Sequence, residues 1–250
     1  MDMSYFKNRR TVRKYKNEAI PMDKVKSMLE DAMRAPTTGN MQLYSAIITT
    51  DNEIKQQLAP CHFNQPQLMQ APVVITFCAD FNRFNKWCEY GNAVPGYDNF
   101  LSFMTATIDA SIYAHQFNTI AELNGYGCCH LGTTNYNAPQ IAKILHLPKF
   151  VVPIITLTLG IPDGESPQCE RLPVEAVIHM ETYHDYSTAD IERLHKEKEE
   201  LEINKKFVEE NGKTHLAQVF TDVRYTKANN EYFSKVLHDF MVESGFKLPE

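Results

Sequence analysis

Over the first 180 residues, segments with the apolar spacing of helices alternate with short apolar runs typical of strands. Apolar residues three or four positions apart predict a helix that begins at Pro21 and ends near Pro36. Short helices are also expected after Asp51 and from Asn137. Runs of β-branched and aromatic residues predict strands over residues 44–50, 73–78, 128–131 and 151–159.

Residues 98–123 carry the longest helical pattern in the chain. Apolar or small side chains cover most of its circumference, at Phe100, Phe103, Met104, Thr107, Ile108, Ser111, Ile112, Ala114, Phe117, Ile120 and Ala121. A helix that is apolar on most sides is usually enclosed by other elements, so we expect a long buried central helix. Before it, residues 81–97 are rich in aromatics but contain Gly91, Pro95 and Gly96. We expect this segment to be irregular and to act as a lid.

Helices that alternate with a few strands around one central helix predict a three-layer α+β fold. Beyond Arg171 the chain changes character, because residues 188–210 are highly charged with only a thin apolar seam. Two further helices are expected over residues 214–224 and 230–244. This helical C-terminal part has too little apolar surface to fold alone, so we expect it to pack on the main domain or on a second subunit.

Composition and charge narrow the classes of function. Hydrophobic residues make up 43% of the chain and charged residues 22%, as in an ordinary globular protein. A formal net charge of -6 argues against general nucleic-acid binding. None of the six cysteines forms a C-x-x-C pair, and neither His62 nor His130 has the neighbours of a metal ligand. We expect reduced thiols, no metal, no membrane association and a cytoplasmic location.

Four segments carry residues suited to binding chemistry. The first runs from Arg9 to Tyr15 and contains Arg9, Arg10, Thr11 and Arg13. Guanidinium groups bind phosphate oxygens through paired donors, and a hydroxyl can add a further contact. If the backbone is extended, Thr11 and Arg13 point to one side and Arg10 to the other. A solvated basic patch or a nucleic-acid-binding arm would have the same composition.

The other three segments are loops. Residues 35–42 place small hydroxyls, a glycine and amides between a helix and a strand, where they could meet the polar edge of a flat ring. Residues 127–134 bring glycines to a strand end, which allows the backbone to approach a ligand closely. This second loop lacks the G-x-G-x-x-G dinucleotide pattern. Arg171 follows a loop rich in proline and glycine. Each segment, taken alone, fits an ordinary loop equally well.

Taken together, their order and spacing resemble the FMN-dependent nitroreductase family, above all its larger, oxygen-insensitive NADPH nitroreductase and flavin reductase group. The start R-R-T-V-R-K-Y resembles the [HR]-R-S-x-R-x-[FY] segment of the family, and A-P-T-T-G-N-M-Q resembles its A-P-[ST]-[ST]-x-N-x-Q loop. H-L-G-T stands where the family has I-G-G, and E-R-L-P where it has [KR]-x-R-x-P. The resemblance covers residues 4–180 and, more loosely, the tail.

This resemblance implies a mostly antiparallel central sheet with helices on both faces. It also implies an FMN-binding core over residues 1–180, a helical extension over 181–250, and a homodimer whose interface forms the site. Arg10 and Arg171 would bind the FMN phosphate, while Gln65 would hydrogen-bond the flavin ring and a backbone N–H near Gly132 would lie at N5. The implied cofactor contacts are Arg9, Arg10, Thr11, Arg13, Gln65, His130, Leu131, Gly132, Thr133 and Arg171, with Thr37, Thr38, Gly39 and Asn40 contributed by the partner subunit.

Three departures from the family pattern stand out. Cys169 occupies the place of a second basic residue before Arg171, and Thr133 replaces the second glycine of the turn. The tail also shows no counterpart of the arginines that related enzymes use on the adenosine 2'-phosphate. The phosphate site therefore has one basic residue fewer, and the choice between NADPH and NADH stays open.

The expected reaction follows from the cofactor, because the flavin carries the chemistry and no catalytic side chain is required. NADPH or NADH would deliver hydride to N5 in a ping-pong cycle, and a nitroaromatic, quinone or flavin acceptor would then take two electrons. Arg13, or its neighbour Lys14, would stabilise negative charge near N1 and O2. A flavin reductase on the same scaffold is the alternative, and a non-enzymatic basic-arm module is the remote one.

Overall fold

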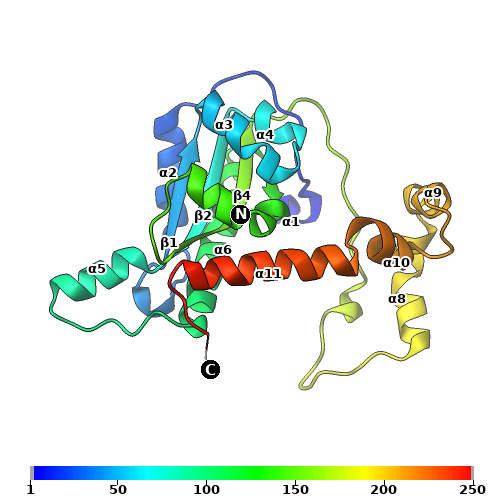
Figure 1. Ribbon diagram of the computed structural model, residues 1–250. Coiled ribbons are helices and arrows are strands. Elements are labelled where there is room, and N and C mark those ends of the chain that lie inside the picture. The colour runs from blue at the N-terminus through cyan, green and yellow to red at the C-terminus, as the bar shows by residue number, and fades with distance from the viewer. Residues whose placement is uncertain (1–2, 249–250) are drawn as a thin grey trace. The chain divides into compact units, whose positions relative to one another are not determined.

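The computed structural model describes residues 3–248 and divides into two compact units (Figure 1). The first unit contains the chain up to Pro167 together with the segment from Phe233 onward, and the second contains Gln168–Tyr232. The expected division into domains after residue 180 stays a prediction, whereas the contacts themselves separate the chain at Pro167 and again at Phe233.

The first unit is built on a four-stranded sheet in the order β1-β2-β4-β3, and each neighbouring pair is antiparallel. The strands are β1 (Tyr44–Thr49), β2 (Val73–Asp80), β3 (Gly127–Leu131) and β4 (Val151–Gly160). β2 and β4 lie in the middle and are almost wholly buried, as their continuous apolar runs predict. The predicted strands are confirmed to within two residues at each end.

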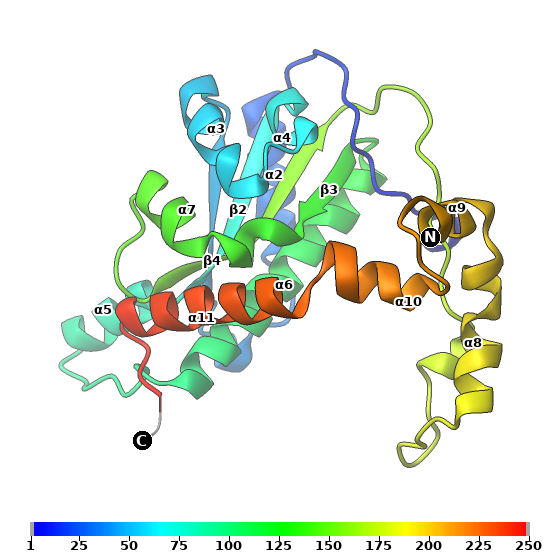
Figure 2. The same cartoon turned by 45° about the vertical axis from the view of Figure 1, so that its right-hand side comes forward.

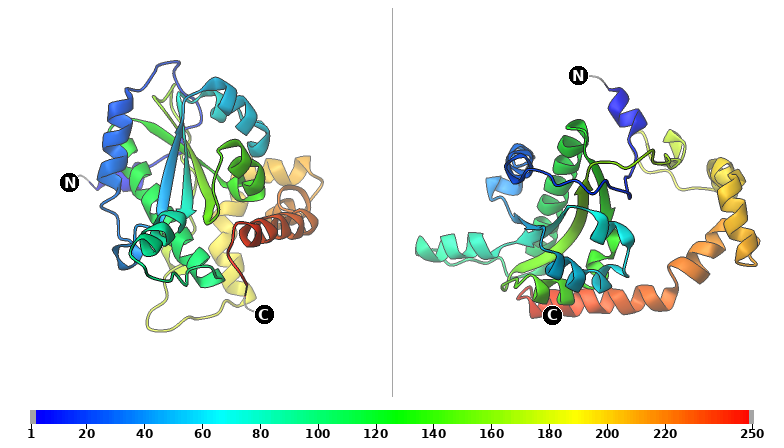
Figure 3. Two further views of the ribbon diagram at one scale, coloured as in Figure 1. Left: turned by 60° about the vertical axis from the view of Figure 1, so that its left-hand side comes forward. Right: turned by 90° about the horizontal axis from the view of Figure 1, so that it is seen from above.

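Helices cover both faces of this sheet, which confirms the predicted three-layer α+β arrangement (Figures 2 and 3). Alternate residues of β2 point to opposite layers: Val73, Ile75 and Phe77 face one core, and Val74 faces the other. The first layer holds α2 (Met22–Ala32) and α6 (Phe100–Leu123), and the second holds α3 (Asn52–Leu58), α4 (Pro66–Gln70) and α7 (Ala138–Ile144).

The N-terminal segment after α1 (Ser4–Asn8) lies along the β3 edge of the sheet. Val12 N donates to Cys128 O at 3.0 Å, and Lys16 N donates to Ile161 O at 2.9 Å. Two glycines make this approach possible. A Cβ on Gly127 would lie 2.6 Å from Val12 Cβ, and a Cβ on Gly160 would lie 2.5 Å from the Tyr15 ring. Backbone bonds and close packing therefore fix the basic segment beside β3.

The long central helix α6 is buried along its sheet-facing side, as predicted, but a single chain does not enclose it on all sides. Its sheet-facing residues, such as Ala106, Ala110 and Phe117, are buried. Its opposite face is apolar but open to solvent, with Leu101 74% and Ile108 53% exposed. We call this open face the α6 stripe; it consists of Phe100, Leu101, Met104, Ile108 and Ile112. The helix is apolar around most of its circumference, yet one chain covers only one side of it.

Residues 82–90 form the regular helix α5 (Asn82–Tyr90), so the expectation of an irregular lid over residues 81–97 is wrong for its first half. The glycines and the proline that suggested irregularity all lie at positions 91–96, behind the helix. The Asp80 carboxylate accepts from Arg83 N at 3.2 Å and satisfies a free amide of the first turn. The Phe81 and Tyr97 rings stack 5.2 Å apart, which fixes both ends of the segment.

The tail has two parts. The second unit contains α8 (Thr188–Glu200), α9 (Glu202–Glu210), α10 (Leu216–Val219) and the π-helical turn Phe220–Arg224. α11 (Lys227–Glu243) begins in this unit and continues in the first. There the Phe233 ring stacks on Tyr136 at 4.5 Å, and Phe246 is fully buried in the main core.

Gly160→Ala is expected to destabilise the first unit by about 1–3 kcal/mol, because the new methyl group would overlap the buried Tyr15 ring. Gly96→Ala is the matched control, since a Cβ at Gly96 meets no atom within 4 Å. Urea unfolding of the two variants and the wild type measures the difference. Equal midpoints for both variants would contradict the proposed packing.

Candidate functional site

The predicted basic segment lies at the β3 edge, where its arginines have different partners. Arg9 Nη2 lies 3.2 Å from Glu122 Oε1, a largely buried carboxylate near the end of α6. Arg10 is exposed and donates through Nη1 to Ser166 O at 2.9 Å. Thr11 is half-buried, and Arg13 is exposed. Arg9 is thus paired with an acid of the same chain, whereas Arg10 and Arg13 are exposed and form no ion pair within residues 3–248.

A polar chain joins this segment to the loop that contains Gln65. Burial raises the pKa of the Cys129 thiol, while the neighbouring charge of Arg13 lowers it. The Gln67 side chain also lowers the pKa of this thiol, and it donates through Nε2 to Gln65 Oε1 at 2.7 Å. The structure therefore brings Arg13 and Gln65 to the same edge of the sheet through two intermediate side chains.

The chain of contacts continues to Thr133. Gln65 Nε2 lies 3.5 Å from Thr133 Oγ1, and His62 Nδ1 lies 2.8 Å from the same hydroxyl. His62 is fully buried. Sequence reasoning placed His62 near the site but gave it no role, because the pairing with Thr133 joins positions 71 residues apart. The threonine that departs from the family pattern is therefore held by two side chains.

The turn after β3 offers an open backbone. His130 and Gly132 are exposed, whereas the Leu131 side chain is buried in the second core. A Cβ built on Gly132 would have no atom within 4 Å, so this side of the turn is free. A flat ring could therefore approach the backbone at Gly132 closely on this side. This geometry fits a flavin at the predicted place.

The loop with Thr37, Thr38, Gly39 and Asn40 lies at the opposite, β1 edge of the sheet. Both hydroxyls donate to the carboxylate of Asp109 in α6, Thr37 Oγ1 at 2.6 Å and Thr38 Oγ1 at 2.9 Å. Gly39 and Asn40 remain exposed. Sequence analysis missed Asp109; the signal was a single acid within an otherwise apolar stretch of helix.

The two groups of predicted residues do not meet within one chain. Three strand-to-strand steps separate β1 from β3, which amounts to about 14 Å. Along α6, Asp109 holds one group and Glu122 the other, and thirteen residues of helix span about 20 Å. The α6 stripe lies on the same helix. One chain therefore carries two separate halves of a site.

Arg171 lies in the second unit and is exposed. It donates through Nη1 to the carbonyl oxygens of Cys169 at 3.2 Å and Glu170 at 2.7 Å. Glu170 in turn pairs with Lys198 at 3.3 Å. Arg171 is thus held by its own loop, and Cys169 presents a free, exposed thiol beside it.

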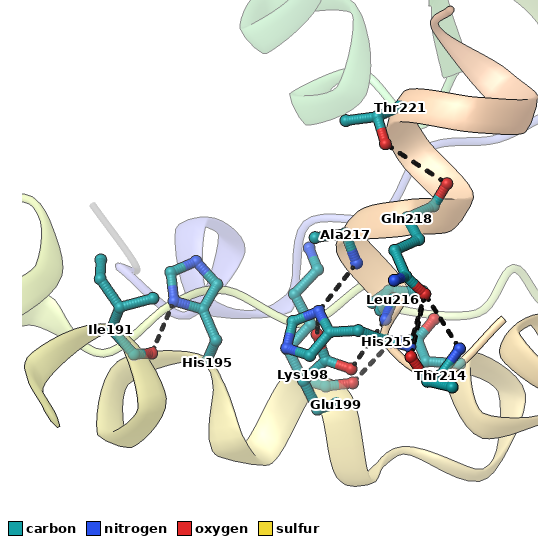
Figure 4. A network of polar contacts seen from close by, with 11 residues as sticks. Ile191, His195, Lys198, Glu199, Thr214, His215, Leu216, Ala217, Gln218 and Thr221 are labelled. Atoms are coloured by element: carbon teal, nitrogen blue, oxygen red, sulfur yellow. Dashed lines mark hydrogen bonds and ion pairs between the residues drawn. The ribbon is translucent and has the colours of Figure 1, made fainter. Parts of the chain in front are cut away.

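The second unit also contains a groove of about 960 Å³ between α8 and α10, which sequence analysis did not find. Its polar wall is fixed at the start of α10: Glu199 accepts from Leu216 N at 3.1 Å and His215 Nδ1 from Ala217 N at 3.2 Å (Figure 4). Two lysines and three glutamates line it, and one of the lysines, Lys198, is already paired with Glu170. This charge pattern does not favour a phosphate ligand.

Within residues 3–248, no helix combines the length and the apolar character needed to cross a bilayer. Over the same residues, no cluster of three or more His, Cys, Asp or Glu side chains could hold a metal ion.

Burial lowers the pKa of His62 from its ordinary value near 6.5 to about 4. The unfolded chain therefore binds a proton between about pH 6.5 and pH 4 that the folded chain does not. We expect the free energy of unfolding to fall as the pH is lowered through this window, by at most about 3 kcal/mol from His62.

His62→Asn removes this titration, so its unfolding free energy should depend less steeply on pH. Urea unfolding at about pH 7.5 and about pH 4.5 measures the slope. His146→Asn is the control, because His146 is exposed and asparagine tolerates its positive φ of 52°. Identical slopes for His62→Asn and the wild type would contradict the assignment.

Comparisons with known proteins agree with this geometry. The family model described as the nitroreductase family matches residues 6–161. An FMN reductase [NAD(P)H] of Bacillus subtilis (strain 168) is 32% identical over 176 residues, which cover 70% of this chain and 71% of that protein. A crystal structure from Bacteroides fragilis NCTC 9343 is 52% identical with a TM-score of 0.96, over 98% of this chain and 99% of that one. The NfrA1 nitroreductase of B. subtilis is 25% identical with a TM-score of 0.85, over 98% of each chain. The resemblance found in the sequence is confirmed: the chain belongs to the nitroreductase family.

Proposed function

We propose that this protein is an FMN-dependent NAD(P)H oxidoreductase that works as a homodimer. The observation that carries the proposal is the separation of the predicted contacts into two halves, held about 20 Å apart on α6 by Asp109 and Glu122. A second copy of the chain can supply the missing half to each site. The similarity to a B. subtilis FMN reductase supports FMN and NAD(P)H as cofactor and electron donor.

The α6 stripe supports the dimer. Its apolar side chains are exposed in one chain, and they lie on the helix that holds both half-sites. Burying them against a second copy would remove a continuous apolar surface from water. Asp109 lies near the middle of α6 and Glu122 near its C-terminal end. If the α6 helices of two chains packed antiparallel, the loop with Thr37 and Thr38 of one chain would therefore lie near the β3 edge of the other.

Arg10 and Arg13 have free donors at the β3 edge, and we assign them to the phosphate and to the ring, respectively. Arg171 would add a second guanidinium to the phosphate. The guanidinium of Arg9 is paired with Glu122, so Arg9 would contribute to cofactor binding through its positive charge. Thr11, between the arginines, would contribute its hydroxyl.

The turn from His130 to Thr133 would lie against the flavin ring, with the open backbone at Gly132 facing it. Gln65 would hydrogen-bond the ring edge, and Thr37, Thr38, Gly39 and Asn40 of the partner subunit would close the other side. Bound FMN would supply the capacity to accept hydride from NAD(P)H and to pass two electrons on. Arg13 would hold negative charge near N1 and O2, and Lys14 is its nearest basic neighbour in sequence.

The proposed acceptors are small electron-poor molecules: nitroaromatics, quinones or free flavin. The similarity to an FMN reductase favours free flavin as one of them. Steady-state rates with one acceptor of each class, measured with NADPH and with NADH, would rank both substrates. The cytoplasmic location remains a prediction.

The direct test is an absorbance spectrum of the purified protein with FMN added, followed by anaerobic titration with NADPH and NADH. We expect a flavin band that stays with the protein on desalting and bleaches with either donor. A protein that retains no FMN would overturn the proposal, and a shift of labelled DNA by such a colourless protein would favour the basic-arm alternative.

Ile108→Glu places a charge in the α6 stripe, where Ile108 is 53% exposed in one chain. We expect a shift from dimer to monomer in sedimentation and a weaker affinity for FMN by at least about tenfold, because each site would lose its second half. Lys24→Glu, on the exposed side of α2, is the control for added negative charge. A dimer with unchanged FMN affinity in Ile108→Glu would contradict the proposed interface.

A further inference from the structure

We propose that Asp109 is a positioning residue for the flavin site: it fixes the conformation of the loop Thr37–Gln42 (the β1 loop) and ties that loop to α6. This inference rests on the proposed function, because it assigns the β1 loop to a flavin. It goes beyond that function by naming a buried residue, absent from every predicted contact, on which the loop depends.

Four groups of the loop and the strand that follows it converge on this carboxylate. Asp109 Oδ2 accepts from Thr37 Oγ1 at 2.6 Å, and Asp109 Oδ1 accepts from Thr38 N at 3.0 Å and from Thr38 Oγ1 at 2.9 Å. Leu43 N lies 3.4 Å from Oδ2, where β1 is about to begin. Gln42 N donates to Thr37 Oγ1 at 3.0 Å, so the same oxygen also closes the loop on itself.

The charge of Asp109 has no cationic partner. The side chain is 1% exposed, and among residues 3–248 no lysine, arginine or histidine nitrogen forms an ion pair with it. A buried carboxylate in this position is stabilised by hydrogen-bond donors alone. Its donors come almost entirely from the β1 loop, so the loop and the carboxylate stabilise each other.

The backbone of the loop needs such support. Gly39, Asn40 and Gln42 have φ values of 55°, 54° and 55°, in the left-handed region. Glycine adopts this region freely, asparagine tolerates it, and glutamine is strained there. Strained backbone persists when the surrounding structure fixes it, and it concentrates where ligands bind. The bonds to Asp109 are the surrounding structure that fixes this loop.

Asp109 also links the loop to the proposed interface. Ile108 and Ile112, its neighbours on α6, belong to the exposed stripe, while Asp109 itself faces the protein interior. The exposed tip of the loop, at Gly39 and Asn40, is therefore fixed relative to the helix face that the partner subunit would cover. In a dimer, this link would set where the tip meets the flavin of the other subunit.

Two variants test the role. Asp109→Asn keeps the shape of the side chain but replaces one acceptor oxygen with an NH₂ donor. This donor would face the Thr37 hydroxyl or Leu43 N, which are themselves donors in the wild type. Thr37→Val keeps Asp109 and removes one donor, so it remains informative if Asp109→Asn does not fold. Thr37→Ser restores the hydroxyl and should restore the wild-type behaviour. Thr50→Val is the control for an exposed threonine outside the loop.

Amide hydrogen exchange over residues 38–43 without FMN reports the loop alone, and fluorescence titration gives the Kd for FMN. In Asp109→Asn and Thr37→Val we expect exchange to be faster and the Kd higher, each by at least about tenfold, since a buried group loses its partner. Far-UV circular dichroism checks that the variants fold.

Unchanged exchange in both variants, or faster exchange with an unchanged Kd, would overturn the inference while leaving the proposed function intact. Failure of Thr37→Ser to restore the Kd would overturn it as well, because a hydroxyl at position 37 is its central claim. A wild-type protein that does not bind FMN would instead overturn the proposed function, and the exchange measurement would then show separately whether Asp109 fixes the loop.

Discussion

The arrangement of the first unit depends on α6, which is buried on one side and exposed on the other. The helix is apolar around most of its circumference, yet one chain covers only the side that faces the sheet. Its two internal acids, Asp109 and Glu122, are stabilised by different partners, one by hydroxyl and amide donors and the other by Arg9 and the Tyr5 hydroxyl. Each acid thereby fixes a segment from elsewhere in the chain. A single helix thus sets the distance between the basic segment and the β1 loop.

The β3 edge is organised by packing as much as by polar bonds. Gly127 and Gly160 leave room for Val12 and Tyr15, so the N-terminal segment can lie directly against the sheet. This leaves Arg10 and Arg13 exposed near an open turn, while Gln65, His62 and Thr133 form a polar layer below it. Exposed guanidiniums of this kind can bind an anionic group through paired donors.

Local patterns were sufficient for the strands and for the order of the elements, because period-two and helical spacings arise from burial on one face. Local patterns failed where a residue is held by a partner that lies far away in the sequence. α5 was missed because Gly91, Pro95 and Gly96 were read together with residues that precede them, although Asp80 already starts a helix. The predicted site residues came from motif resemblance. Asp109, Glu122 and His62 did not, since their partners in these contacts lie 71 to 113 positions away and leave no local signature.

The return of the chain to the first unit at Phe233 bears on how the protein is made. Phe246 fills a place in the main core beside Phe103 and Phe150, and Phe150 N donates to Ser244 O at 2.7 Å. These contacts join residues separated by the entire second unit. During synthesis, the sheet can therefore assemble early on the ribosome, but its core stays open at Phe103 until Phe246 has also left the exit tunnel. Emergence of Phe246, rather than of the sheet alone, closes this part of the core.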